Sequence, residues 1–173
     1  MLRNNLTCKS HRHIVYIVFQ CYTSFHFALN TSDDTKIYTL DFTKSPVAVV
    51  SKLETTITDD AYIKSSLNVN KYLFEGTNVE HKITCLFGDS AEFDFSPFLE
   101  KVDSFFIDGA HSYDYVKSDT LNALKCCHKG SVVAWHDYGR VGVNGVTKWL
   151  LELAKENKIY SIPGGSLAFM LVE

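Results

Sequence analysis

Two short apolar runs stand close together at the end of the chain, where residues 159–172 read IYSIPGGSLAFMLV. We expect both runs to be strands, Ile159–Ile162 and Leu167–Val172. The residues between them, Pro163 to Ser166, are enough for a hairpin turn but too few for the crossover that joins parallel strands. The last strand is therefore predicted to run antiparallel to the one before it.

Further strands are expected from apolar runs without polar alternation, a pattern typical of strands that are covered on both faces. These runs are Ile14–Phe19, Lys36–Leu40, Lys82–Phe87, Ser104–Ile107 and Ser131–Trp135. Helix-like segments separate them, and this alternation favours a parallel sheet. The expected fold class is α/β, with a doubly wound, mostly parallel, Rossmann-like sheet that ends in a reversed C-terminal hairpin strand.

The clearest helix is expected between His111 and Gly130, because its apolar residues recur at three-, four- and seven-residue steps. Ser112 is the expected N-cap, and the basic residues before Gly130 form a stop signal. A second helix is expected over residues 143–157. The stretch Thr43–Asn78 has weaker signals, and we expect it to be a partly helical, mobile segment over the sheet edge.

The composition limits the classes of function. The length of 173 residues fits a single domain over residues 1–173. A formal net charge of −3 disfavours nucleic acid as a partner. The apolar run Ile14–Phe19 is far too short to cross a membrane, and we expect no membrane segment. The five cysteines include no C-x-x-C pair, which indicates free thiols in a reducing, cytoplasmic compartment.

Ligands of an open α/β sheet bind beyond the carboxyl ends of its strands, so the polar residues there are candidates for function. They are Asp41, Asp89, Ser90, Asp108, His111, His136 and Asp137. From its position alone, Asp41 either accepts hydrogen bonds from the hydroxyls of a ribose or is an ordinary turn or cap residue. Asp89 and Ser90 either contact a nucleobase edge or form an Asx turn.

Asp108 and Asp137 are expected to end neighbouring strands, which would bring two carboxylates together. A divalent cation such as Mg²⁺ would offset their repulsion. His111 is placed to take a proton from a hydroxyl held on that metal, or else it is a helix-start residue bonded to backbone. His136 is expected to support or pack against the site rather than to bind the metal.

Three segments carry a family resemblance: residues 86–91 (LFGDSA), 105–113 (FFIDGAHSY) and 130–139 (GSVVAWHDYG). They resemble the class I S-adenosylmethionine-dependent methyltransferases, and among these the branch of macrocin-type, metal-dependent sugar O-methyltransferases. The likeness extends over about residues 36–173. The reversed last strand agrees with that fold.

The resemblance implies a cofactor site for S-adenosylmethionine. Asp41 would hold the ribose, Asp89 and Ser90 would lie on the adenine side, and Asp108 would also belong to the site. It further implies that Asp108 and Asp137 bind Mg²⁺ and that His111 is the general base.

The implied reaction is an in-line displacement at the sulfonium methyl group by an oxygen of a small hydroxylated acceptor. Good alignment of the two reactants contributes on the order of 7–11 kcal/mol to such a step. A homo-oligomer is a possible assembly.

The chain departs from the family after its first strand. The family has an acidic residue and a glycine-rich loop there, whereas residues 18–25 read VFQCYTSF and the first glycine is Gly76. Glycine lets the backbone approach the cofactor closely. A second hypothesis is therefore a catalytically degenerate binding or scaffold protein. A further hypothesis is that residues 1–22 are a truncated or atypical form of the family's N-terminus. A nicotinamide-dependent oxidoreductase is disfavoured, because G-x-G-x-x-G is absent and the last strand is reversed.

Overall fold

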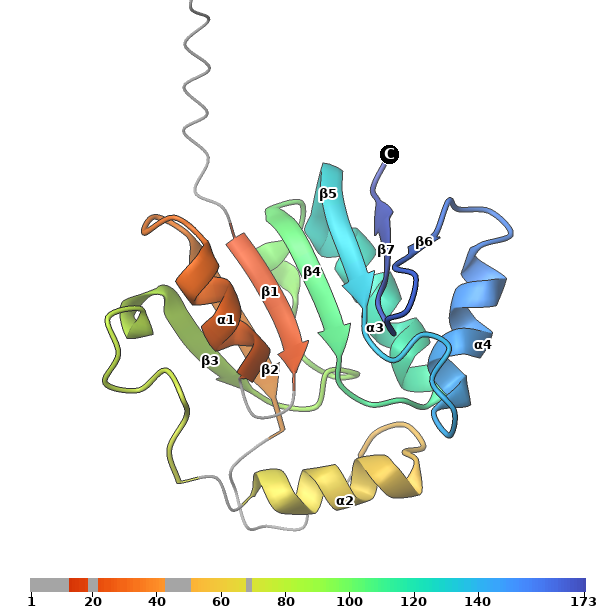
Figure 1. Ribbon diagram of the computed structural model, residues 1–173, viewed down its shortest axis with the longest axis horizontal. Coiled ribbons are helices and arrows are strands. Elements are labelled where there is room, and N and C mark those ends of the chain that lie inside the picture. Colours follow the sequence, from red (N-terminus) through yellow and green to blue (C-terminus); the bar gives the residue numbers. More distant parts are fainter. Residues whose placement is uncertain (1–12, 19–21, 43–50, 68–69) are drawn as a thin grey trace, which may run out of the picture.

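The computed structural model describes residues 13–18, 22–42, 51–67 and 70–173. In this part of the chain, one sheet has the strand order β3-β2-β1-β4-β5-β7-β6 (Figure 1). Its strands are β1 (His13–Val18), β2 (Lys36–Asp41), β3 (Ile83–Phe87), β4 (Val102–Asp108), β5 (Cys127–Trp135), β6 (Tyr160–Ser161) and β7 (Ala168–Leu171). The α-helices are α1 (Tyr22–Asn30), α2 (Ile57–Ser66), α3 (Tyr113–Cys126) and α4 (Asn144–Leu153), with 3₁₀ turns at Glu80–Lys82 and Ser96–Phe98.

The direction of the last strand is as the sequence predicts. Strands β1 to β5 pair in parallel, whereas β7 is antiparallel to both of its neighbours, β5 and β6. The turn before β7 contains Gly164, whose φ of +76° is in the left-handed region that glycine adopts readily. The expected α/β fold, with a mostly parallel sheet and a reversed C-terminal strand, is confirmed.

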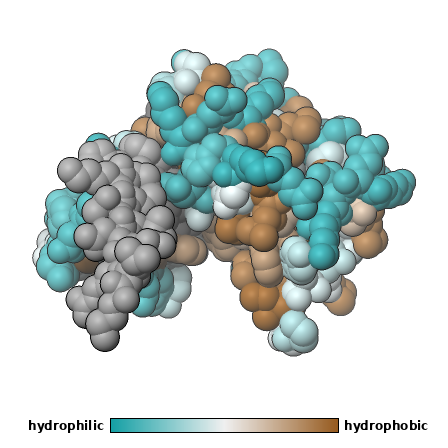
Figure 2. Space-filling model, turned by 90° about the horizontal axis from the view of Figure 1, so that it is seen from above, coloured by the Kyte–Doolittle hydropathy of each residue, from teal (hydrophilic) through white to brown (hydrophobic). Residues whose placement is uncertain are grey.

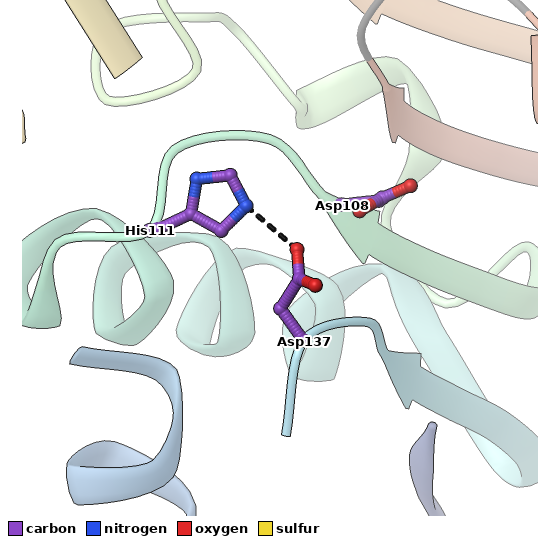
Figure 3. Close-up of side chains that lie close together, drawn as sticks. All are labelled: Asp108, His111 and Asp137. Atoms are coloured by element: carbon purple, nitrogen blue, oxygen red, sulfur yellow. Dashed lines mark hydrogen bonds and ion pairs between the residues drawn. The ribbon is translucent and has the colours of Figure 1, made fainter. Parts of the chain in front are cut away.

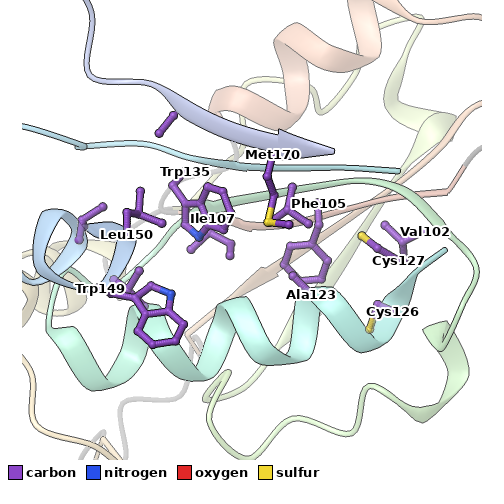
Figure 4. Packing of buried hydrophobic residues seen from close by; sticks show 14 of the residues in the cluster. Val102, Phe105, Ile107, Ala123, Cys126, Cys127, Trp135, Trp149, Leu150 and Met170 are labelled. Atoms are coloured by element: carbon purple, nitrogen blue, oxygen red, sulfur yellow. The ribbon is translucent and has the colours of Figure 1, made fainter. Parts of the chain in front are cut away.

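Helices cover both faces of the sheet, as in a doubly wound fold. Helix α1 lies on one face, and α3 lies on the other with α4 beside it (Figure 1). The larger core lies between the sheet and α3 (Figure 4). At its centre, the buried hydroxyl of Thr120 accepts hydrogen bonds from the indole nitrogens of Trp135 (2.9 Å) and Trp149 (3.0 Å). This threonine on α3 therefore links the helix to β5 and to α4.

Helix α3 begins as expected but ends early. The Ser112 hydroxyl accepts a hydrogen bond from the Tyr115 amide (3.3 Å), which confirms the predicted cap. The predicted stop at Gly130 is wrong, because α3 ends at Cys126 and residues 127–130 already belong to β5. Pairing with β4 begins at Cys127 and outweighs the local helix signal.

Helix α2 confirms that the stretch Thr43–Asn78 is partly helical, but its expected position over the sheet edge is wrong. It crosses the carboxyl ends of the strands instead (Figure 1). A capping box begins the helix: the Thr56 hydroxyl accepts from the Asp59 amide, and the Asp59 carboxylate accepts from the Thr56 amide. Residues 43–50 and 68–69 lie outside the described part of the chain.

Several smaller expectations have clear outcomes. Cys85, Cys126 and Cys127 are free thiols, as predicted, and Cys8 and Cys21 lie outside the described residues. Among the described helices, none has the length and apolar character to cross a bilayer.

Figure 2 shows the end of the molecule opposite to α2, where hydrophilic side chains surround smaller apolar areas. The polar groups that the sequence selects for function lie at the other end of the parallel strands.

A buried lysine fixes the end of α1. The Lys82 side chain is 4% exposed, and its ammonium donates to the carbonyl oxygens of Ala28 (2.5 Å) and Thr31 (2.8 Å). Carbonyls at a helix C-terminus have no partners within the helix, and a cation there satisfies them and the helix dipole together. The strand expected over Lys82–Phe87 therefore begins one residue later, at Ile83, because Lys82 belongs to the preceding turn.

We expect Lys82→Met to lower the free energy of unfolding by about 2 kcal/mol, because it leaves one buried and one part-buried carbonyl without this donor. Urea denaturation followed by circular dichroism measures this change. Lys101→Met is the matched control, since Lys101 also donates to one carbonyl, that of Pro97, but does so at the surface. Its effect is expected to stay within about 0.5 kcal/mol. Equal losses in the two variants would contradict the role of Lys82.

Candidate functional site

A cavity of about 310 Å³ lies at the carboxyl ends of the strands, between the strand ends and α2. Its lining includes most of the residues that the sequence selects: Asp41, Ser90, Asp108, His111, His136 and Asp137. These residues come from β2, β4 and the loops that follow β3, β4 and β5. The topological rule for open α/β sheets therefore locates the cavity correctly.

His111 lies between the carboxylates of Asp59 and Asp137 at one side of the cavity, and Figure 3 shows its contact with Asp137. Its Nδ1 atom is 2.6 Å from Oδ1 of Asp59, and its Nε2 atom is 2.7 Å from Oδ2 of Asp137. Burial favours the neutral ring, but the hydrogen bonds to Asp137 and Asp59 outweigh it and raise the pKa of His111 to about 9. Without ligands, the ring is therefore an imidazolium that holds both carboxylates.

Asp137 contacts three basic side chains. Besides His111, it accepts a hydrogen bond from Nη1 of Arg140 (2.8 Å) and lies 3.2 Å from Nδ1 of His136. Burial works against its charge, yet the bonds from His111, Arg140 and His136 hold the pKa of Asp137 well below its usual range. Its φ of +60° is left-handed, a conformation that aspartate tolerates better than most residues.

Asp108 lies beside this carboxylate, at the end of β4. Burial raises the pKa of Asp108 to about 6, and the charge of Asp137 adds to this effect while that of His136 opposes it. The Nδ1 atom of His136 is 3.2 Å from an oxygen of each aspartate, so it bridges the pair. His136 thus supports both acids, which agrees with its expected supporting role.

These groups fit a divalent cation. One ligand atom each from Asp108, His111 and Asp137 lie within 4.8 Å of one another. Carboxylate oxygens are the ligands that Mg²⁺ prefers, and the raised pKa of Asp108 indicates that positive charge at this point would be stabilising. His111 would be a metal ligand only as a neutral ring.

Asp59 is a site residue that sequence reasoning missed. Both of its oxygens also accept the backbone amide of His111 at 3.1 Å, so it holds the ring and the backbone of this residue. Burial opposes its charge, but hydrogen bonds from His111 and Thr56 outweigh it and lower the pKa of Asp59. The only signal in the sequence is the capping pattern Thr56-x-x-Asp59, which predicts a helix start and not a contact with a distant histidine.

Gly145, in the first turn of α4, packs directly against the backbone of the loop that carries His111. A β-carbon at this position would lie 2.2 Å from the His111 carbonyl oxygen and 2.5 Å from the Tyr113 amide nitrogen. These are backbone atoms, so any side chain at Gly145 would have to displace the loop that carries His111. Close packing of α4 on this loop therefore depends on glycine.

Asp89 and Ser90, the residues expected on the adenine side, differ in their surroundings. The Asp89 carboxylate accepts from the Tyr115 hydroxyl (2.8 Å), the Lys52 amide (2.7 Å) and the Ala91 amide (2.9 Å). The last of these bonds is an Asx turn. Ser90 lines the cavity, so Asp89 fixes the loop to α3 while Ser90 faces the ligand space.

The remaining expected positions lie along the same cavity. Asp41, at the end of β2, lines it and accepts a hydrogen bond from the Phe42 amide (2.8 Å). Tyr22 and Thr23, in the first turn of α1, also line it. Of the glycine-free segment after β1, residues 19–21 lie outside the described part of the chain.

Known structures share this fold. TomG, an O-methyltransferase from Streptomyces achromogenes involved in tomaymycin synthesis and solved in complex with SAM, superposes with a TM-score of 0.57. The two sequences are 17% identical, and the match covers 95% of this chain and 74% of TomG. A candidate caffeoyl-CoA O-methyltransferase from Staphylococcus aureus gives a TM-score of 0.63 at 18% identity, with coverage of 94% and 76%. At these identities the likeness establishes the fold.

The sequence itself matches the family Methyltransf_24, described as a methyltransferase domain, over residues 21–138. No curated protein matches the chain significantly. The family match covers more than half of the chain and includes the strand ends that build the cavity. The chain therefore belongs to this methyltransferase family and has the class I methyltransferase fold.

Proposed function

We propose that the protein transfers the methyl group of S-adenosylmethionine to a hydroxyl oxygen of a small acceptor, with the assistance of a divalent metal ion. The observation that carries this proposal is the convergence of Asp108, His111 and Asp137 at one cavity of a methyltransferase fold. Two acids suited to a metal and a histidine suited to proton transfer can together activate a hydroxyl for O-methylation.

The cofactor is proposed to lie along the strand ends from β2 to β4. The carboxylate of Asp41 is suited to accept hydrogen bonds from the ribose hydroxyls. Ser90 would contact the adenine, and Asp89 would act indirectly by holding the Ser90 loop against Tyr115. This order along the cavity leaves the side near His111 for the methyl group and the acceptor.

Asp108 and Asp137 would hold the metal ion, which when bound lowers the pKa of an acceptor hydroxyl and fixes its direction. His111 would remove the hydroxyl proton through Nε2, while its Nδ1–H group continues to donate to Asp59. Because Nε2 is bonded to Asp137 in the ligand-free protein, His111 acts as a base only where Asp137 takes another partner. Arg140 already donates to the other oxygen of Asp137.

The alternative function is a binding or scaffold protein that keeps the fold without turnover. The observation that favours it is the segment between Val18 and Phe25, which contains no glycine where the family has its cofactor loop. Side chains in this segment would occupy space that a glycine leaves to the methionine end of the cofactor. The two functions differ in whether the cofactor binds.

Isothermal titration with S-adenosylmethionine, with and without Mg²⁺, tests the proposal directly. We expect binding at micromolar to submillimolar concentration. A titration without heat at millimolar cofactor, supported by an unchanged melting temperature, would favour the scaffold instead.

We expect His111→Gln to lower methyl transfer by at least about a hundredfold, the range that a lost general base produces. Binding of S-adenosylmethionine should change little, because the cofactor contacts are proposed on β2 and on the loop after β3. Release of S-adenosylhomocysteine is measured with a panel of small phenols, catechols and sugars, and cofactor affinity is measured by titration. His128→Gln, a surface histidine bonded to Asp103, is the control. Full activity of His111→Gln would reject this residue as the base.

We expect Asp137→Asn to weaken Mn²⁺ binding by about tenfold or more while the protein still folds, because a charged ligand is lost and asparagine also tolerates the left-handed backbone. Electron paramagnetic resonance of free Mn²⁺ gives the affinity, and thermal unfolding gives the stability. Asp114→Asn, an exposed aspartate in the first turn of α3, is the control. Unchanged Mn²⁺ affinity in Asp137→Asn would contradict the metal site.

A further inference from the structure

A buried carboxylic acid outside the proposed machinery lies next to the cofactor side of the cavity. Asp119, on α3, has 0% exposure, and neither of its carboxyl oxygens makes a hydrogen bond within the described part of the chain. Burying a carboxylate without partners is strongly unfavourable, and such an orphaned group in a native protein calls for an explanation. The position of Asp119 in the fold supplies one.

Asp119 and Tyr115 are four residues apart on α3, so they share one face of the helix. Tyr115 on this face donates to Asp89, and the hydroxyl of the next loop residue, Ser90, is close enough to Asp119 to favour its charged form. Both contacts therefore go to the same loop after β3. Ser90 is 8% exposed and lines the cavity, whereas Asp119 is fully buried and is not among the lining residues.

The surroundings of Asp119 favour its neutral form. Burial raises the pKa of Asp119 to about 7, the nearby Ser90 hydroxyl opposes this shift, and the charge of Asp89 adds to it. Among the described residues, Asp89 on the loop is the charged group that acts on Asp119, and Tyr115 on the same helix donates to Asp89. Below about pH 7 the acid thus keeps its proton and can donate it in a hydrogen bond.

We propose that Asp119 is a positioning residue for Ser90: in the cofactor complex, the buried acid donates to the Ser90 oxygen and so directs the hydroxyl hydrogen of Ser90 into the cavity. There it binds an acceptor nitrogen of the adenine ring. An ionised Asp119 would instead accept that hydrogen, and Ser90 would then offer only an acceptor to the ligand. The inference rests on the proposed binding of S-adenosylmethionine and names a determinant of its affinity.

The probe is S-adenosylhomocysteine, which carries the same adenine and needs no acceptor or metal for the measurement. Its affinity is measured by isothermal titration at pH 6 for the wild type and for Asp119→Leu, Ser90→Ala and the double variant. Each single change should weaken binding by about tenfold, the factor that loss of one hydrogen bond produces. The double variant should bind no more weakly than either single variant, because both remove the same interaction. Asp114→Asn on the same helix should bind as the wild type does.

A second comparison separates positioning from a purely structural role. The amide of Asp119→Asn donates to Ser90 at every pH, so this variant should match the wild type at pH 6. At pH 8.5, where the acid of the wild type has lost its proton, Asp119→Asn should bind several-fold more tightly than the wild type. This comparison also tests whether Asp119 positions Ser90 if Asp119→Leu does not fold.

The outcomes distinguish the two proposals. A wild type that binds no S-adenosylhomocysteine overturns the proposed function and this inference with it. A wild type that binds, with Asp119→Leu equally tight or with additive losses in the double variant, overturns the inference alone. The same holds if the wild type and Asp119→Asn have identical affinity at both pH values.

Discussion

The bonding of His111 to two carboxylates connects three separate parts of the chain at the cavity. Asp59 belongs to α2, His111 to the loop after β4, and Asp137 to the loop after β5. All three side chains are at most 10% exposed, so each charge depends on the others for compensation. Loss of one partner leaves a buried charge unpaired, and loss of the Asp59–His111 bonds would weaken the attachment of α2 over the strand ends. The position of α2 and the chemistry of the site therefore depend on the same pair of contacts.

Helix α3 organises the rest of the site as well as the core. Its N-cap follows His111 directly, and its first turn presents Tyr115 to the loop after β3. One turn further on, Asp119 lies near Ser90 of that loop, while the neighbouring Thr120 binds two tryptophans in the hydrophobic core. Adjacent positions on one helix thus serve the cavity and the core. Because the core fixes the helix, it also fixes the loop that faces the ligand.

Local sequence patterns were sufficient to predict the strands of the sheet and the reversed direction of the last one. They failed where pairing over a long distance outweighed a local signal. Residues 127–130 have the composition of a helix end, yet β5 begins at Cys127, opposite Val102 of β4. Likewise, the capping box of Thr56 predicts where α2 begins, but nothing in that segment indicates that the helix crosses the strand ends.

The sequence by itself determined that Asp108, His111 and Asp137 lie at the ends of neighbouring strands. The topology of a parallel sheet brings residues at such positions to the same edge, independently of the contacts that their side chains make. Only the tertiary structure revealed that Asp59 holds His111 and that Asp119 lies buried near Ser90. The reason is physical: the burial and hydrogen-bond partners of a carboxylate are set by segments far away in sequence, and these contacts exist only once the chain has packed.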